Sequence, residues 1–178
     1  LGDSLAAAYG VKREEGFVPK LQTYIIKAGL DYEVVNAGVS GDTTAGGLRR
    51  INWLLKKKVD VLLLELGGND GLRGISPVET QKNLLGIIDK TRTKYPNVKI
   101  ILTGMQMPPN MGREFTKAFA QVFTEVAKIE NITLVPFLLE GIASDPKYNL
   151  PDLIHPNPAG HDIVAANVWK TLKTVIAN

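Results

Sequence analysis

Cysteine is missing from all 178 residues of the sequence. Its absence excludes disulfide bonds, thiolate metal sites and a cysteine nucleophile. It does not restrict the compartment, because a chain without disulfides is compatible with oxidising and reducing surroundings alike. Any nucleophile in this chain must therefore be another residue type.

Long apolar runs are missing as well. The longest aliphatic run, Val61–Leu64, is far shorter than the roughly 20 residues that span a bilayer. We therefore expect no stable insertion into a membrane. No signal peptide is recognisable, and the chain starts at Leu1 with almost nothing ahead of Gly2 to form a first strand. We expect a single domain over residues 1–178 with a truncated N-terminal strand.

A large charge of one sign is also absent, since 21 lysines and arginines stand against 18 aspartates and glutamates. The basic residues are scattered, except for Lys56–Lys58, which we interpret as a solvated face. The sequence has neither a basic nucleic-acid patch nor a glycine-rich phosphate-binding motif. We expect no nucleic-acid partner and no nucleotide cofactor.

Strand and helix patterns alternate along the chain. Short β-rich or continuously apolar runs predict strands, and apolar residues at helical spacing predict helices. This alternation is typical of a parallel sheet with helices on both faces. The strands are expected at 32–35, 59–66, 98–103 and 133–136, and the helices at 17–30, 43–57, 76–94, 115–129 and from 158 onward. Asp42, Ser76 and Asn157 are the expected N-caps.

Polar motifs follow the predicted strands. Leu1–Leu5 places Ser4 at the start of an expected helix, and Asn36–Asp42, Gly67–Asp70 and Asp152–His155 follow later strands. The carboxyl ends of parallel strands lie on one edge of a sheet, where ligands bind. We therefore predict that these four segments form one site.

The residue types in this site indicate hydrolysis. Asp152 lies one turn from His155, so its carboxylate can orient the imidazole and leave Nε2 free to act as a base on Ser4. The backbone N–H groups of Ser4 and Gly41 and the side-chain amide of Asn69 are candidate oxyanion donors. Asn69 alone could equally be a turn residue, since Asn-Asp-Gly suits turns.

These motifs resemble the GDSL, or SGNH, hydrolase family. The matching residues are Gly-Asp-Ser-Leu at 2–5, Gly41, Gly-x-Asn-Asp at 67–70 and Asp-x-x-His at 152–155. The run 63–74 and Ser40–Thr43 are similar to the bacterial branch of multifunctional thioesterase I, lysophospholipase L1 and arylesterase.

The resemblance implies a serine hydrolase that cleaves esters and thioesters of acyl substrates. Ser4 is then the nucleophile, His155 the base and Asp152 its orienter, with Ser4, Gly41 and Asn69 as the oxyanion hole. It implies an α/β, flavodoxin-like three-layer sandwich with a five-stranded parallel sheet, no metal and no cofactor. It also implies export to the periplasm or secretion, while a cytoplasmic location stays open because no signal peptide is visible. We expect a monomer or weak dimer that acts on a small-molecule acyl ester or thioester.

Two other functions remain open at this point. A carbohydrate acetylesterase uses the same fold and triad. A non-catalytic flavodoxin-like module is a different kind of protein, but a receiver would need a lysine after the last strand, and none is suitably placed.

The loop after Asn69 is a candidate substrate gate. Gly71 and Gly74 give it backbone freedom, and the turn at Pro77 anchors its far end. The alternative is an ordinary strand-to-helix connection. The candidate substrate-loop residues are Leu72, Ile75 and Pro77, with Met107 and Pro108 from the segment after residue 103.

Overall fold

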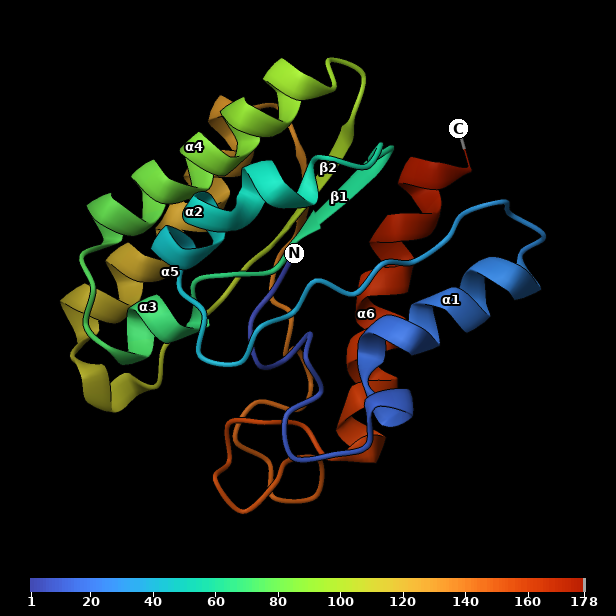
Figure 1. The fold of residues 1–178 in the computed structure, drawn as a ribbon. Helices are drawn as coiled ribbons and strands as arrows, with labels where there is room; N and C mark the ends of the chain where they lie inside the picture. Colours follow the sequence, from blue (N-terminus) through green and yellow to red (C-terminus); the bar gives the residue numbers. More distant parts are fainter. Residues whose placement is uncertain (178) are drawn as a thin grey trace.

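The computed structural model describes residues 1–177 (Figure 1). Within them, three parallel strands form the central sheet in the order β1–β2–β3. The strands are β1 (Val61–Leu64), β2 (Lys99–Thr103) and β3 (Thr133–Val135). Their register pairs Leu62 with Ile100 and Ile101 with Thr133. The α/β class and the parallel sheet predicted from the sequence are therefore confirmed.

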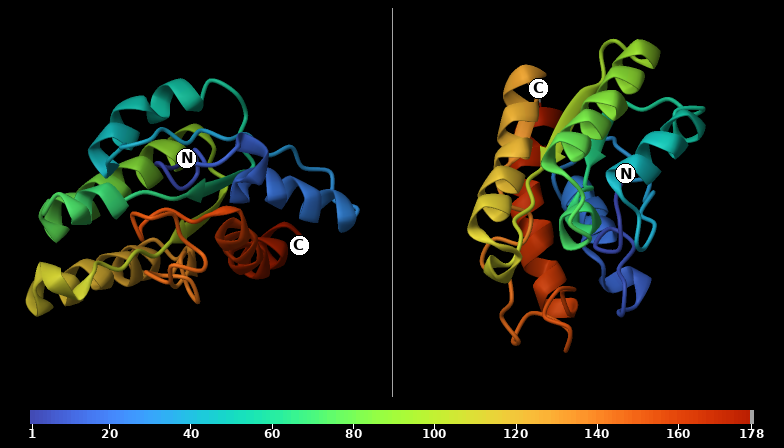
Figure 2. Two further views of the ribbon diagram at one scale, coloured as in Figure 1. Left: turned by 90° about the horizontal axis from the view of Figure 1, so that it is seen from below. Right: turned by 90° about the vertical axis from the view of Figure 1, so that its left-hand side faces the viewer.

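Helices lie on both sides of these strands. Helices α2, α4 and α5 lie together on one side, with α4 between the other two, and α1 and α6 lie on the other side (Figure 1 and Figure 2). Helix α1 packs beside α6. The α-helices are α1 (Phe17–Lys27), α2 (Thr44–Leu54), α3 (Gly68–Leu72), α4 (Pro77–Lys94), α5 (Arg113–Ile129) and α6 (Pro158–Ile176), and two short 3-10 helices occupy Arg13–Glu15 and Pro109–Met111.

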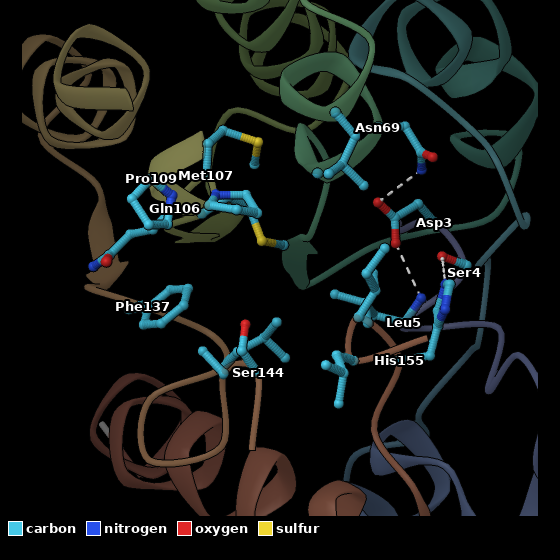
Figure 3. Close-up of a pocket in the computed structure, with 18 residues that line it drawn as sticks. Asp3, Ser4, Leu5, Asn69, Gln106, Met107, Pro109, Phe137, Ser144 and His155 are labelled. Atoms are coloured by element: carbon cyan, nitrogen blue, oxygen red, sulfur yellow. Dashed lines mark hydrogen bonds between the residues drawn. The ribbon is translucent and has the colours of Figure 1, made fainter. Parts of the chain in front are cut away.

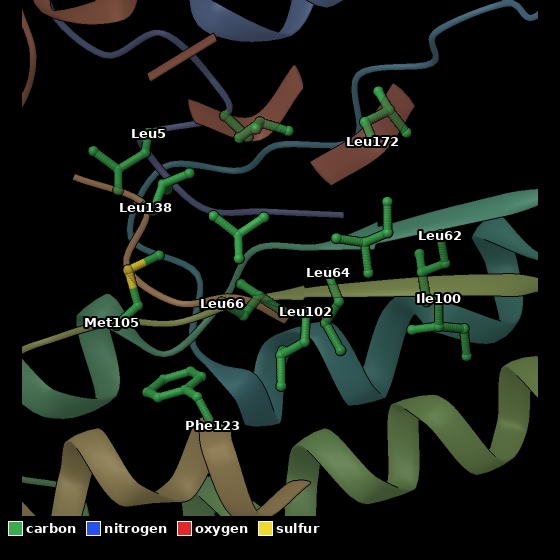
Figure 4. Packing of buried hydrophobic residues seen from close by; sticks show 14 of the residues in the cluster. Leu5, Leu62, Leu64, Leu66, Ile100, Leu102, Met105, Phe123, Leu138 and Leu172 are labelled. Carbon is green, nitrogen blue, oxygen red and sulfur yellow. The ribbon is translucent and has the colours of Figure 1, made fainter. Parts of the chain in front are cut away.

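The core fills the space between the sheet and these helices (Figure 4). Leu64 and Leu102 on neighbouring strands are fully buried, and Phe123 reaches the same cluster from α5. The apolar face of α5 packs on this core, whereas Ile129 is exposed at the end of the helix. Within residues 1–177, no helix is both long and apolar enough to cross a membrane.

The prediction of five strands was wrong for the described residues. The segment 32–35 belongs to no strand of the sheet, and the side chain of Gln22 bonds Tyr32 O and Val34 N instead. Gly2 forms isolated parallel bridges to both Gly38 and Glu65, so it lies between that segment and the end of β1. A single bridging residue does not extend a ladder, and 32–35 is left without a neighbouring strand.

The helix expected at Ser4 was also wrong. Residues 3–10 form successive turns, in which Asp3 Oδ1 accepts from Leu5 N at 3.0 Å. Ala8 has a positive φ of 58°, which a helix excludes. These turns hold Ser4 on a bend two residues after Gly2.

The caps were predicted with one error. Ser76 caps α4 through Val78 N, and Asn157 caps α6 through Gly160 N. Helix α2 is capped by Thr43, whose side chain accepts from Gly46 N, and not by Asp42. Asp42 instead forms an ion pair with Arg50 at 2.7 Å.

Candidate active site

Ser4, His155 and Asp152 form a continuous chain of hydrogen bonds. The Oγ atom of Ser4 lies 2.9 Å from His155 Nε2 (Figure 3). On the other side of the ring, His155 Nδ1 lies 2.7 Å from Asp152 Oδ2. The spacing Asp-x-x-His brings the carboxylate to the ring within one turn of loop. The geometry is that of a hydroxyl, a base and an orienting carboxylate.

Asp152 is fixed by backbone groups of the same loop. Its Oδ1 accepts from Ile154 N at 2.9 Å and from His155 N at 3.0 Å. Burial acts to raise the pKa of Asp152, but these N–H groups and the His155 ring outweigh it, so that the pKa is lowered. The carboxylate therefore stays ionised near neutral pH and can hold the Nδ1 proton of His155.

The loop that carries this pair is closed by its own backbone. Leu150 N donates to His155 O at 2.7 Å, and Asn157 N donates to Tyr148 O at 2.9 Å. The ring of Tyr9 packs on the ring of His155, with 4.6 Å between their centroids. The imidazole is thus held from the loop side and from the turn that carries Ser4.

Asn69 lies at the start of α3, immediately after β1. Gly67, which precedes α3, has a φ of 119° that favours glycine, and this bend directs the chain away from the strand. The Nδ2 atom of Asn69 donates to Asp3 Oδ2 at 3.2 Å and to Asp42 O at 3.0 Å. Asn69 is therefore not a simple turn residue, because its amide ties together the segments that carry Ser4 and Gly41.

The backbone N–H groups of Ser4 and Gly41 remain available. Within the described residues, neither group donates to another part of the protein. Gly41 has a φ of 78°, and Arg73 Nη2 donates to its carbonyl at 2.9 Å. Two unengaged donors and one side-chain amide thus belong to the segments that meet at Ser4.

A cavity of about 310 Å³ opens beside Ser4 and His155 (Figure 3). Its walls are mostly apolar, with Leu5, Leu72, Met105, Met107, Pro108, Pro109, Phe137, Leu139, Leu153 and Ile154 among the lining residues. A volume of this order suits a small organic ligand.

Three of the five predicted substrate-loop residues, Leu72, Met107 and Pro108, line this cavity, whereas Ile75 and Pro77 do not. Pro77 instead begins α4. Residues that sequence reasoning missed are Phe137 and Leu139, which follow β3, and Leu153 and Ile154. The last two stand inside the Asp-x-x-His motif, so their apolar character next to His155 was a usable signal.

The second histidine, His161, is separate from this cavity. It is buried in α6, and its Nδ1 accepts from Phe17 N at 3.2 Å. Burial, followed by the charge of Lys20, lowers the pKa of His161 to about 4. His161 is therefore a packed residue of the core. No group of three or more acidic or histidine side chains within residues 1–177 could hold a metal ion.

Comparisons with known proteins identify the family of this chain. Residues 1–163 match the GDSL-like lipase/acylhydrolase family. The chain is 44% identical to "Esterase TesA" of Pseudomonas aeruginosa over 177 residues, which is 99% of this chain and 87% of the relative. It is 35% identical to "Thioesterase 1/protease 1/lysophospholipase L1" of Escherichia coli K12, over 99% of this chain and 83% of the relative.

A solved structure also matches this chain in fold. The esterase EstA from Pseudoalteromonas sp., described as inhibited by monoethylphosphonate, superposes with a TM-score of 0.93 at 34% identity. The match covers 100% of this chain and 97% of that one.

Proposed function

The chain belongs to the GDSL-like lipase/acylhydrolase family, and from that premise we propose that Ser4, His155 and Asp152 carry out its hydrolysis of carboxylic esters and thioesters. The observation that supports this assignment best is the 2.9 Å contact between Ser4 Oγ and His155 Nε2 at the edge of the cavity. Relatives named esterase, arylesterase and thioesterase support the reaction class.

The reaction follows from these contacts. His155 Nε2 takes the proton of Ser4 Oγ as that oxygen attacks the acyl carbon, and Asp152 stabilises the imidazolium that forms. The tetrahedral intermediate collapses when His155 returns the proton to the leaving alcohol or thiol, which leaves the acyl group on Ser4. Water, deprotonated by the same imidazole, then releases the acid and restores Ser4.

The oxyanion requires one rearrangement. An amide nitrogen has two protons, and both on Asn69 are already directed to Asp3 and Asp42. One of them must turn toward the substrate oxygen, where it joins the N–H groups of Ser4 and Gly41. The contact to Asp42 O is the one we expect to be exchanged, while the contact to Asp3 stays in place.

The substrate is proposed to be an ester or thioester with an apolar acyl chain. The apolar walls formed by Leu72, Met107 and Phe137 would cover such a chain and exclude water. A carbohydrate acetylesterase would need polar groups along the walls, so this alternative is less well supported. Export to the periplasm, which the resemblance implies, is also a proposal, and cell fractionation tests it.

The test is covalent labelling with a fluorophosphonate, followed by mapping of the adduct. We expect modification at Ser4 alone, no labelling of Ser4→Ala, and strongly reduced labelling of His155→Ala. Turnover of aryl, acyl-CoA and lysophospholipid substrates should disappear in both variants, while circular dichroism stays that of the parent protein. An adduct at another serine would refute the assignment.

A further inference from the structure

Behind the candidate oxyanion residue lie two carboxyl groups buried against each other. Asp3 and Glu65 are 2% and 1% exposed, and Asp3 N donates to Glu65 Oε2 at 3.1 Å. Glu65 stands directly after β1, where its backbone bridges Gly2. A Cβ at Gly2 would lie 2.4 Å from Glu65 Oε2, so any side chain there would displace the carboxyl group.

No basic side chain within the described residues neutralises this pair. Arg50 donates to Gly2 O and to Asp42 Oδ2 instead. The buried ammonium of Leu1, whose charge also acts on Glu65, donates to Leu63 O at 2.9 Å. Glu65 Oε1 is buried without any partner. An ionised carboxylate in this position would leave one charged oxygen unsatisfied, whereas a neutral acid can carry its proton there.

Two carboxyl groups in contact cannot both ionise at low cost. Burial and then the charge of Asp3 raise the pKa of Glu65 well above its usual value, while burial raises the pKa of Asp3 to about 6. Glu65 therefore holds the proton and Asp3 the charge near neutral pH. Asp3 uses that charge to accept from Leu5 N at 3.0 Å and from Asn69 Nδ2 at 3.2 Å.

We propose that Glu65 is a positioning residue of the esterase site: as a neutral acid behind Asp3, it keeps a single negative charge there that aims the amide of Asn69. Figure 3 shows the contact between Asp3 and Asn69. Glu65 does not touch the substrate, because it does not line the cavity. It acts through Asp3, which fixes the turn of Ser4 by one oxygen and Asn69 by the other. This inference rests on the proposed oxyanion role of Asn69.

Two variants of Glu65 test the proposal, and they differ in the hydrogen-bonding groups that they offer to Asp3. Glu65→Gln keeps a neutral donor and an oxygen acceptor, so we expect kcat within about threefold of the parent. Glu65→Leu removes both, and we expect kcat to fall about tenfold with KM unchanged, because Asn69 is no longer aimed. Thr103→Val is the matched control: it is also a buried polar-to-apolar change at a strand end, but it lies outside this chain of contacts.

A double-mutant cycle gives the decisive readout. In an Asn69→Ala background, Glu65→Leu should cost less than about twofold in kcat, because its effect passes through the missing amide. If Asn69→Ala lowers kcat and Glu65→Leu lowers it further by the full factor seen in the parent, the role of Glu65 is overturned but the oxyanion role of Asn69 is not. An Asn69→Ala variant with unchanged kcat would overturn the oxyanion assignment and this inference together.

A measurement on the parent protein avoids any failure of a variant to fold. Carbon-13 NMR of the side-chain carboxyl carbons should show Glu65 protonated and Asp3 ionised at about pH 7. An ionised Glu65 under these conditions would overturn the proposal. So would a loss of kcat in Glu65→Gln as large as in Glu65→Leu.

Discussion

The Oγ atom of Ser4 lies 2.9 Å from Nε2 of His155, although 151 residues separate them in the chain. Ser4 stands on the first turn of the described chain, and His155 on the loop that leads into α6. Both segments are fixed independently, the first by Asp3 and the second by Asp152. Small changes in either carboxylate should therefore have large effects on hydrolysis.

Asp152→Asn tests the second of these supports. The asparagine amide favours the wrong tautomer of His155, in which Nε2 carries the proton and cannot accept one from Ser4. By comparison with the serine-protease triad, kcat should fall about 10²–10⁴-fold while the fold is retained. Steady-state kinetics on an aryl ester checks this. A loss of less than fivefold, on the order of a surface substitution, would show that the pair is not needed.

Asn69→Ala tests the oxyanion assignment. An oxyanion donor acts on the transition state, so kcat should fall about 10²–10³-fold with little change in KM. Thermal unfolding must be measured in parallel, since the same amide ties Asp3 to Asp42 O. A raised KM with unchanged kcat would make Asn69 a substrate-binding residue instead.

The sequence was a good guide to the site and a poorer guide to the sheet. The site motifs could be predicted because each is a short run of residues whose side chains have a recognisable catalytic chemistry. The Asp-x-x-His spacing also sets a local geometry, and the structure has the expected contact between Asp152 and His155. Their convergence followed from the parallel arrangement alone. The strand at 32–35 failed because strand formation depends on a neighbour, and the residues that lie between it and β1 provide only one bridge.

The buried carboxyl pair was not predicted either. Glu65 follows the apolar run Val61–Leu64, and a glutamate in this position is typical of the solvent-exposed end of a strand. Its burial depends on Gly2, which lies far away in the sequence and leaves room for the carboxyl group. Likewise, Gly71 was expected to give the loop freedom to move. In the structure Met107 packs so closely against Gly71 that a Cβ there would lie 2.1 Å from its Sδ atom.

His161 should make the protein sensitive to acid. Its pKa is lowered to about 4 in the folded protein, whereas an unfolded histidine titrates near 6.5. The unfolded state therefore binds more protons between these values, and stability is lost as pH falls through this window. The free energy of unfolding that this group contributes should fall by about 3 kcal/mol once the pH reaches the lower end of this window.

His161→Gln is the reference for that measurement, because its side-chain oxygen can still accept from Phe17 N. Asp3 and Glu65 have raised pKa values and act in the opposite direction, so only the difference between the two proteins isolates His161. Urea unfolding at several pH values should show the parent losing stability relative to the variant on acidification. Parallel curves would contradict the prediction.

Gly71→Ala should shorten the acyl chains that the enzyme accepts. A Cβ at this position would lie 2.1 Å from Sδ of Met107, a flexible side chain that lines the cavity. The methionine must move, and the space beside it is the proposed acyl site. We expect kcat/KM for long-chain esters to fall about tenfold relative to the acetyl ester, since one methylene in an apolar pocket has an effect of this size.

Gly74→Ala is the matched control, and it also decides whether the loop is a gate. A Cβ at Gly74 meets nothing within 4 Å, so the substitution adds only backbone strain at a φ of 66°. The loop is otherwise held at both ends, by Arg73 on Gly41 O and by Ile75 N on Asp70 O. Rates from acetyl to dodecanoyl esters should then shift in parallel for Gly74→Ala and diverge for Gly71→Ala.

If Gly74→Ala alters the chain-length preference as well, motion of the loop controls access to the cavity, and packing on Met107 is not the sole determinant. Restoration of long-chain activity by Met107→Ala in the Gly71→Ala background would identify the displaced methionine as the cause.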